Sequence, residues 1–332
     1  MSATIVPPAV DATTRRPVRP RYEGSNICTW IGFKHVNYLV EEAVLDHLRR
    51  HGMPAGTLYE RFGLCVDLVD LDTRILHAFH IDDVAVAEVR RLPDPATTGL
   101  AFAVEITVDR GERLRAVAAK VLVQLRLDPD GADAEPVPDA LAGYVTDRLA
   151  GVTRRAPRVP DLLAGTDPRD ALTAGRNAVA WSWRIPYFYC HFTRRVQMSG
   201  YLRLMEEVVD LFLAERKISI DTLLREQSWI PVVPHSQITV LDEALMEEEV
   251  HTVLTVENVF KGFTYTARMD CYVLRDGVLT PVATGRITHG YAVIENRRDW
   301  HLVEFDDRMR DALGGGAASV TGRGRAGAGA RP

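Results

Sequence analysis

The sequence lacks any apolar run near the roughly 18–20 residues that a membrane helix needs. Its first 20 residues lack the apolar stretch of a signal peptide. We therefore expect a cytoplasmic protein with no membrane partner. Cysteine is scarce, and the four thiols at positions 28, 65, 190 and 271 have neither metal-ligand spacing nor the density of a disulfide framework. We expect reduced, mostly buried thiols, with no metal and no cofactor.

An excess of basic charge is also missing. The formal net charge is -5, from 40 Lys and Arg against 45 Asp and Glu, which disfavours a nucleic-acid partner. Phosphate-binding glycine loops and the GxSxG and HExxH motifs are absent. What remains is an ordinary globular composition over 332 residues, 46% hydrophobic and 26% charged. That length allows one or two domains, and two would each be large enough for a core.

Three stretches depart from this composition. Residues 1–20 carry four prolines, and residues 313–332 are rich in Gly and Ala with scattered Arg, so we predict a disordered arm and a disordered tail. Residues 128–180 are rich in Pro, Arg and Asp, which predicts a linker with one short helix at about 139–149. These bounds leave two domains, at residues 21–127 and 181–312.

The two domains are copies of one another. Glu41-Glu42 recurs as Glu206-Glu207, 165 residues further on. The same separation relates Val44 to Val209, Leu48 to Leu213, Leu58 to Leu223, Leu76 to Leu241, and Leu114 to Leu279. One offset that persists across so long a span indicates an internal duplication.

Each copy shows the same order of predicted elements: a short apolar strand, a long helix, then alternating, β-branched strands. In the first copy they fall at 25–30, 38–52, 63–71, 74–80, 84–92, 100–109 and 114–127. In the second they fall at 185–192, 201–217, 229–234, 236–241, 249–258, 263–275 and 280–295. The helix around Glu206 is apolar on more than one face, which predicts burial. The fold class is therefore α+β, with an antiparallel sheet wrapped around each helix.

The start of the first helix, GFKHVNYL at residues 32–39 followed by Glu41-Glu42, resembles the 4-hydroxybenzoyl-CoA thioesterase family of hotdog proteins. Residues 200–207, GYLRLMEE, keep the helical part of the motif. The resemblance covers about residues 25–127 and 185–295, and implies two hotdog domains that form a pseudo-dimer within one chain. The loop aspartate usual in that family is missing. Thr29-Trp30 stands near its place in the first copy, and His191 falls there in the second.

The catalytic candidates lie at the helix starts, because a helix N-terminus offers unpaired N–H groups and partial positive charge to a developing oxyanion. His35 is a candidate base, and Asn37 either polarises the thioester carbonyl or caps the helix. A carboxylate on a buried helix needs a partner or a task, and of the two acidic pairs we favour Glu42 and Glu207. The catalytic candidates are therefore His35, Asn37, Glu42, Glu207 and His191.

The substrate-binding candidates surround the same helix starts. Arg194 and Arg195 are either phosphate-gripping residues or solvated loop charges, with equal weight. Gly200 allows close approach of a substrate carbonyl to the backbone. The full set is Gly32, Phe33, Tyr38, Arg194, Arg195, Gly200 and Tyr201.

Three functions stay open at this point. The first, implied by the resemblance, is a thioesterase acting on acyl-CoA or acyl-carrier-protein thioesters, in lipid or polyketide-type biosynthesis. The second is a dehydratase or hydratase of 3-hydroxyacyl and enoyl thioesters, with His35 and Glu207 as its histidine–acid pair. The third is a silent acyl-binding subunit, which the missing aspartate favours and the motif retained in the first copy disfavours. A homodimer of double-hotdog protomers is left open.

Overall fold

The computed structural model describes residues 5–93, 97–128, 134–153, 155–163, 165–190, 192–297 and 299–314. In the first copy, the long helix is α1 (Phe33–Arg50), and a 3-10 turn η1 (Tyr22–Gly24) and a short helix α2 (Ala55–Phe62) flank it. The strands of this copy are β1 (Thr13–Val18), β2 (Leu64–Ile75), β3 (Ala85–Arg91), β4 (Leu100–Asp109) and β5 (Arg113–Leu127). The connecting segment carries α3 (Asp139–Ala142), β6 (Val145–Thr146) and α4 (Pro168–Thr173).

The second copy repeats this order around its own long helix, α5 (Met198–Glu215). The strands are β7 (Ala178–Arg184), β8 (Trp229–Val240), β9 (Glu249–Phe260), β10 (Thr264–Arg275), β11 (Val278–Glu295) and β12 (Asp299–Leu302). The remaining helices are η2 (Tyr187–Tyr189), α6 (Ile220–Gln227) and α7 (Asp307–Gly314). An isolated bridge joins Trp30 to His80 in the first copy and Arg195 to Leu245 in the second, which keeps the 165-residue spacing in three dimensions.

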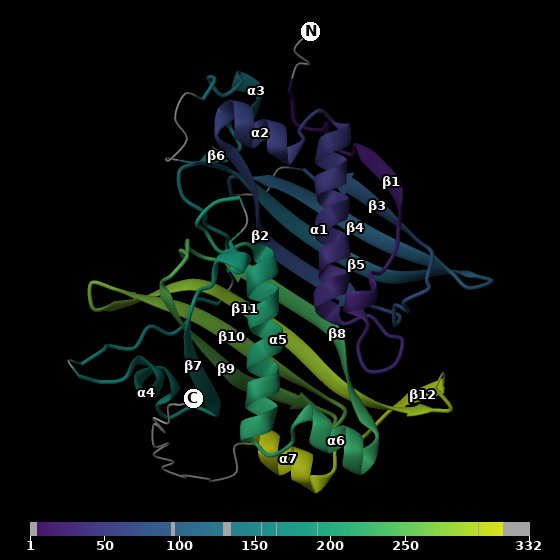
Figure 1. Ribbon diagram of the computed structural model, residues 1–332. Coiled ribbons are helices and arrows are strands. Elements are labelled where there is room, and N and C mark those ends of the chain that lie inside the picture. The colour runs from purple at the N-terminus through teal and green to yellow at the C-terminus, as the bar shows by residue number, and fades with distance from the viewer. Residues whose placement is uncertain are drawn as a thin grey trace, which may run out of the picture.

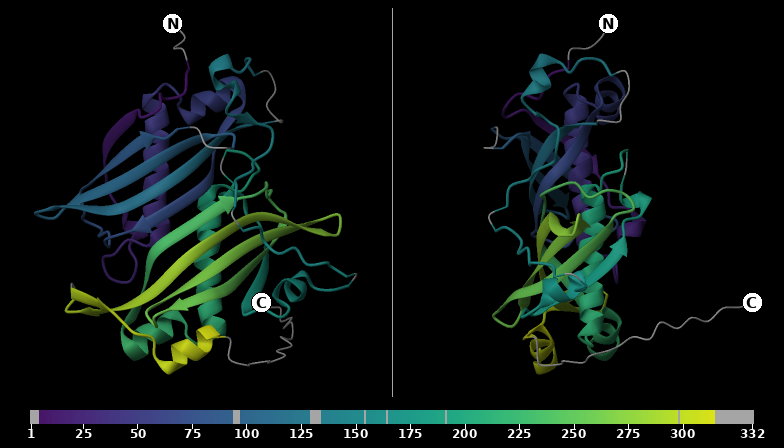
Figure 2. Two further views of the ribbon diagram at one scale, coloured as in Figure 1. Left: turned by 180° about the vertical axis from the view of Figure 1, so that it is seen from behind. Right: turned by 90° about the vertical axis from the view of Figure 1, so that its left-hand side faces the viewer.

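The described residues form one 12-stranded sheet across both copies, in the order β1-β3-β4-β5-β2-β8-β11-β10-β9-β7, with β6 on β5 and β12 on β11. Both long helices cover the same face of this sheet (Figure 1). From behind, the strands lie in front of α1 and α5 (Figure 2). The predicted α+β architecture and the pseudo-dimer within one chain are therefore confirmed.

Each long helix packs one apolar face on its half of the sheet. Along α1, the fully buried residues Val36, Val40, Val44 and Leu48 recur every four positions, which places them on one side of the helix. The buried face of α5 includes Met205, Val208 and Phe212. The acidic residues at 206, 207 and 210 lie on its exposed side, so α5 is amphipathic rather than buried all round.

The two halves meet where β2 pairs with β8. Five residue pairs form this antiparallel seam, from Asp70 opposite Thr239 to Arg74 opposite His235. At its middle, Thr73 lies opposite Ser236, and α1 crosses above with the fully buried Asn37. Thr73 Oγ1 donates to Asn37 Oδ1 at 2.6 Å, and Asn37 Nδ2 donates to Ser236 Oγ at 3.1 Å and to Phe33 O at 2.9 Å. Asn37 thus ties its helix to strands of both copies.

Several predicted elements change in the structure. Residues 13–18 of the supposed disordered arm form edge strand β1, because pairing with β3 satisfies the backbone of a segment that has no apolar alternation of its own. The first strands predicted at 25–30 and 185–192 are wrong, since β1 and β7 take that place. Helices α2 and α6 were not predicted. The helix predicted at 139–149 ends at Ala142, and the tail at 315–332 lies outside the described residues.

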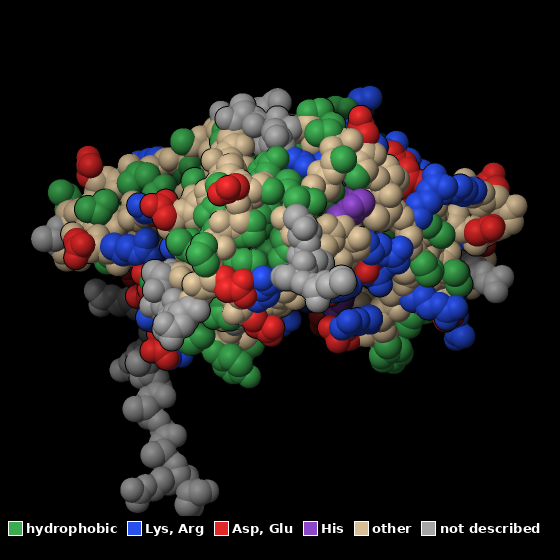
Figure 3. All heavy atoms as spheres, turned by 90° about the horizontal axis from the view of Figure 1, so that it is seen from above, with side chains coloured by type: hydrophobic (Ala, Val, Ile, Leu, Met, Phe, Trp, Pro, Cys, Tyr) green, Lys and Arg blue, Asp and Glu red, His purple; other side chains and the backbone are tan. Residues whose placement is uncertain are grey.

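The cysteines, the helices and the charged surface can be compared with the sequence-based expectations. All four cysteines are unpaired, and three are buried while Cys28 is exposed, as expected. No helix in the described ranges is long and apolar enough to cross a bilayer. On the face seen from above, basic and acidic side chains are interspersed around a group of hydrophobic ones, so this face carries charges of both signs (Figure 3).

Deleting residues 1–20 should destabilise the protein, because β1 and the buried side chains of Ile5 and Val18 are lost and the edge of β3 is exposed. Burying two such side chains stabilises by about 3 kcal/mol or more, so the melting temperature should fall by about 5 °C or more. Calorimetry measures this fall. Deleting residues 315–332 is the control, and an unchanged melting temperature after the N-terminal deletion would contradict the role of β1.

Thr73→Val should destabilise the protein at the seam. The change keeps the shape of the side chain but leaves the buried Asn37 Oδ1 without its donor. A buried polar group that loses its partner costs about 1–3 kcal/mol. Urea denaturation of Thr73→Val and of Thr13→Val, which alters an exposed threonine on β1, measures the difference. Equal effects of the two changes would show that the network around Asn37 contributes nothing special.

Candidate active site

A cavity of about 790 Å³ lies beside the N-terminus of α1, where β2 and β8 separate at one end of the seam. The first copy contributes the start of α1 and residues 75–80, and the second contributes parts of α5, α6, β8 and β10–β12. The volume falls in the range of small-molecule sites. Because both copies supply its walls, neither half forms this cavity alone.

A carboxylate from α5 lies over the N-terminus of α1. Glu206 accepts a hydrogen bond from Lys34 Nζ, and its Oε1 lies 3.9 Å from the point where a Cβ on Gly32 would stand. The N-cap residue of α1 is Gly32, which has no side chain to accept hydrogen bonds from the first N–H groups of the helix. Within the described ranges, the backbone N–H groups of Phe33 and Lys34 have no partner, as expected in a first helical turn. The start of α1 therefore places two free backbone donors, one of them on the cavity-lining Phe33, beside a carboxylate held by a lysine.

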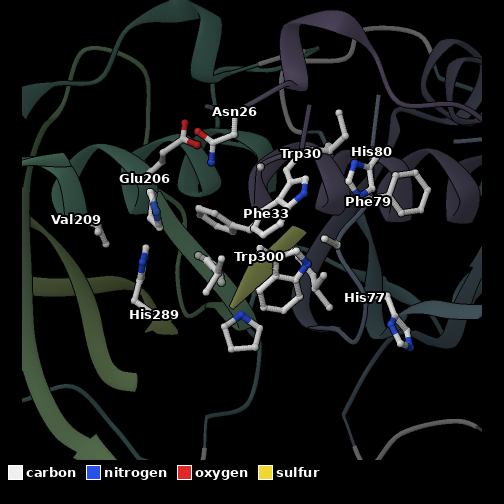
Figure 4. A pocket seen from close by; sticks show the side chains of 18 of the residues that line it. Asn26, Trp30, Phe33, His77, Phe79, His80, Glu206, Val209, His289 and Trp300 are labelled. Atoms are coloured by element: carbon white, nitrogen blue, oxygen red, sulfur yellow. The ribbon is translucent and has the colours of Figure 1, made fainter. Parts of the chain in front are cut away.

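Most of the remaining wall is apolar. Trp30 and Trp300 meet edge to face, with ring centroids 5.3 Å apart, and Phe33 lies beside them (Figure 4). Asn26 and Glu206 lie near one another at one end of the cavity in the same view. This arrangement suits a ligand that is mostly hydrocarbon with a reacting polar group at the carboxylate end.

The cavity histidines differ in their surroundings. His80 Nδ1 lies 3.1 Å from Thr29 Oγ1, and burial, helped by the charge of Arg110, lowers the pKa of His80. The side chain of Arg110 is itself held by Asp83, at 2.6 Å. His289 is 5% exposed, and burial lowers its pKa to about 4, so that its imidazole is neutral near pH 7.

The equivalent place in the other half is filled by the connecting segment. Gly151 N donates to Val240 O at 2.7 Å, and a Cβ on Gly151 would lie only 2.6 Å from that oxygen and 2.9 Å from Val69 O. Nearby, Arg148 pairs with Asp242, and Leu149 N donates to Glu243 Oε1 at 3.2 Å. The counterparts of Val69, Val240, Asp242 and Glu243 at the 165-residue spacing are Pro234, Ile75, His77 and Ala78, all in the cavity wall.

A buried ion pair closes this second place further. Arg195 Nη2 lies 3.0 Å from Asp67 Oδ2, and both side chains are almost fully buried. Position 195 corresponds to Trp30, which lines the open cavity. A Cβ on Gly200 would lie 2.9 Å from Tyr189 O, so the turn η2 packs directly against the first turn of α5. The pseudo-symmetric molecule thus has one open site and one filled one.

The structure separates the five residues chosen as catalytic candidates. Glu207 lines the cavity, next to Glu206. His35 lies outside the lining, with Nε2 3.4 Å from Glu23 Oε1, and burial lowers its pKa. Asn37 is committed to the seam, and Glu42 is exposed outside the lining. His191 lies outside the described residues.

The substrate-binding candidates also divide. Gly32 and Phe33 line the cavity. Tyr38 Oη instead donates to Ser199 O at 3.4 Å, between the two helices. Arg194 is exposed, while Arg195 is buried in its ion pair and has no access to a phosphate. The remaining two, Gly200 and Tyr201, are buried at the filled place.

Sequence reasoning missed the residues that complete the site. Glu206 belongs to the acidic pair that the repeat singled out, but the preference fell on its neighbour. Lys34 corresponds to Ser199 at the 165-residue spacing, so only the first copy offers a cation at this position. Trp300 and His289 come from strands far along the chain, and no local pattern marks them. In the described ranges no group of three metal-ligating side chains gathers.

Comparisons with known proteins agree with this architecture. Residues 181–313 match the family model described as the thioesterase-like superfamily. No curated protein matches the sequence. Similar solved structures include the 12:0-ACP thioesterase from Umbellularia californica, with 11% identity over 88% of this chain and 98% of that chain and a TM-score of 0.55. An acyl-ACP thioesterase from Bacteroides thetaiotaomicron VPI-5482 has 9% identity over 83% and 97%, with a TM-score of 0.52.

At these identities the solved structures establish likeness of fold alone. They span nearly the whole of this chain, as a fold made of both copies requires. The family match falls on the second copy, which supplies α5 and its carboxylates. The chain therefore has a tandem hotdog fold, and its second domain is similar to the thioesterase-like superfamily, whose model matches residues 181–313.

Proposed function

We propose that this protein hydrolyses acyl thioesters in the cavity at the N-terminus of α1. One observation carries the proposal: the Glu206 carboxylate, from the helix of one copy, lies over the unpaired N–H groups that begin the helix of the other. The thioesterase-like family match of the second domain and the fold shared with two acyl-ACP thioesterases support the same reaction class.

The geometry suggests how the reaction proceeds. The thioester carbonyl oxygen accepts hydrogen bonds from the backbone N–H groups of Phe33 and Lys34, which stabilise the oxyanion as it forms. Glu206 takes a proton from a water molecule as that water attacks the carbonyl carbon. The tetrahedral intermediate then collapses, the carbon–sulfur bond breaks, and the leaving sulfur takes the proton from Glu206. The products are a carboxylic acid and a free thiol.

Lys34 and the apolar walls complete the mechanism. The Lys34 ammonium donates a hydrogen bond to the Glu206 carboxylate and fixes its direction. The walls around Trp30, Phe33 and Trp300 hold the acyl group. They also exclude water from it, so hydrolysis is confined to the carboxylate end. The acyl group is delivered on the thiol of CoA or of a carrier protein, and no step needs a metal or cofactor.

The dehydratase alternative requires a histidine paired with an acid in the cavity. His35 is oriented toward Glu23 and lies outside the lining, so the proposed pair with Glu207 is not formed. Three described histidines line the cavity: His77 is exposed, His80 contacts Thr29 through Nδ1, and neither ring nitrogen of His289 has a hydrogen-bond partner. The arrangement favours water activation by a carboxylate over histidine-dependent dehydration.

Glu206→Gln should lower kcat for acyl thioester hydrolysis by about 10²-fold or more, because the amide cannot accept the proton of the attacking water. KM should change little, since the amide keeps the volume of the carboxylate. A thiol-detecting assay with acyl-CoA and acyl-carrier-protein substrates measures both constants. Interconversion of 3-hydroxyacyl and enoyl thioesters by the wild type, without thiol release, would favour the dehydratase instead.

Glu41→Gln is the matched control, because Glu41 holds the corresponding position at the filled place. It should retain kcat within about 2-fold, since no substrate reaches it. If Glu41→Gln abolishes activity and Glu206→Gln does not, catalysis takes place in the other half and the assignment is wrong.

Glu41 should also make stability depend on pH. Its Oε2 is buried without a partner, and burial, with the charge of Glu42, raises its pKa from 4.5 to about 7. The folded protein therefore favours the protonated acid, so the contribution of Glu41 to stability is most favourable below pH 4.5 and is lost as the pH rises through 7. Glu41→Gln removes this loss. Relative to the wild type, the variant should gain on the order of 3 kcal/mol between pH 4.5 and pH 8.

Urea denaturation of both proteins at pH 5 and pH 8 measures this difference. The variant should resemble the wild type at pH 5 and exceed it at pH 8. The physical reason is that the counterpart of Lys34 is Ser199, so Glu41 has no equivalent cation to offset its burial. A stability difference that stays constant across this range would show that Glu41 titrates at an ordinary pKa.

A further inference from the structure

His289 is a buried polar side chain in the cavity wall with no protein partner. It is 5% exposed, and neither ring nitrogen has a hydrogen-bond partner. Its ring stacks on Tyr265, with centroids 5.5 Å apart and planes 15° from parallel, which fixes its direction. Burying such a group without a hydrogen bond costs free energy. A residue kept at that cost in a cavity wall suggests a ligand that supplies the missing bond.

The duplicated fold shows that this position needs no histidine for folding. Tyr265 corresponds to Leu100 at the 165-residue spacing. The sheet ladder puts His289 opposite Tyr265 and Val123 opposite Leu100, so on this strand the structure relates His289 to Val123, 166 residues earlier. Leu100 and Val123 are both fully buried. An apolar pair therefore completes the core on the side where the cavity is filled, and a polar pair stands only where the cavity is open.

The local backbone contributes to this arrangement. On β8, Val233 and Pro234 lie opposite His289 alone, because the ladder shifts between Thr288 and Gly290. Two residues against one is a β-bulge, a device that re-aims side chains beside functional sites. Both bulge residues and His289 line the cavity.

The position of His289 relative to the carboxylate indicates what it contacts. Val209 follows Glu206 by three residues on α5, and Figure 4 shows Val209 and His289 on the same side of the cavity. In the same view Glu206, Val209 and His289 follow one another down one side of the cavity, and Val209 and His289 are nearly fully buried whereas Glu206 is partly exposed, so the enclosed end lies in this direction. Three residues of helix rise about 5 Å, which corresponds to roughly three to five carbons of an acyl chain. His289 thus lies along the acyl chain rather than at the thioester.

We propose that His289 is a specificity-determining residue that hydrogen-bonds an oxygen substituent, a hydroxyl or oxo group, on the acyl chain of the substrate. This rests on the proposed thioester hydrolysis and names its substrate class. A neutral imidazole has one donor and one acceptor nitrogen, so it serves an oxo group with the first and a hydroxyl with either. A site built around such a bond disfavours an acyl chain without the oxygen, because the imidazole is then buried unpaired.

The test compares octanoyl-CoA with its 3-hydroxy, 3-oxo and 5-hydroxy derivatives. The wild type should show a kcat/KM at least about 10-fold higher for one or more oxygenated substrates than for octanoyl-CoA. His289→Leu should reduce that ratio to about 1, by losing rate on the oxygenated substrate alone. His289→Gln, which keeps a donor and an acceptor, should retain part of the preference. His251→Phe is the control, since His251 is equally buried on β9 but bonds Ser182 and does not line the cavity.

Two results would overturn the proposal: a wild type that prefers no oxygenated chain, or an equal loss on all four substrates in His289→Leu. Failure of the proposed hydrolysis is seen separately, as absence of thiol release from every substrate. In that case the thermal shift produced by each CoA ester decides. A larger shift with the oxygenated esters that disappears in His289→Leu supports the inference, and equal shifts for all four esters refute it.

Discussion

The seam between β2 and β8 is the constraint on which the rest of the molecule depends. Each hotdog half has a sheet edge whose backbone groups need partners, and pairing these edges within one chain satisfies both at once. Asn37 adds a polar clamp, because its amide bonds Thr73 of one half and Ser236 of the other while sitting on a helix above both. The seam therefore fixes the antiparallel placement of α1 and α5, and with it the distance from a carboxylate on one helix to the N-terminus of the other.

The seam also creates two equivalent places, one at each end, and the chain treats them differently. At one end the strands separate beside Ile75 and Pro234 and leave the cavity. At the other end the connecting segment inserts Gly151 between Val69 and Val240. A protein made of two identical subunits cannot make this distinction, because its symmetry repeats every residue. Fusion into one chain allowed each place to acquire its own side chains, so that Lys34 contacts Glu206 while the position that corresponds to Lys34 in the second copy is Ser199.

The proposed chemistry uses this asymmetry at both ends of the cavity. At the exposed end, free N–H groups and a lysine-held carboxylate provide the charge needed for attack on a thioester. At the enclosed end, apolar walls and the unpaired His289 imidazole face the acyl chain of the proposed substrate. Reaction and selection are thus carried by different residues, drawn from different copies of the repeat, and are separable by substitution.

By itself, the sequence determined the duplication, the α+β class and the placement of both long helices and most strands, because these depend on local periodicity and on an offset repeated along the chain. It also led to the start of α1 and the acidic pair at 206–207 as candidate site residues, and their role stays a proposal. Only the tertiary structure decided that β1 joins the sheet, since an edge strand of Thr and Arg is stabilised by its partner rather than by its own pattern. Only the structure showed that Asn37 lies at the seam while Asn26 lines the cavity. Likewise, only the structure showed that Glu206 lines the cavity while Glu42 does not. The burial, pairing and cavity contacts of these side chains depend on strands and helices that lie far away in the sequence, and no local pattern contains that information.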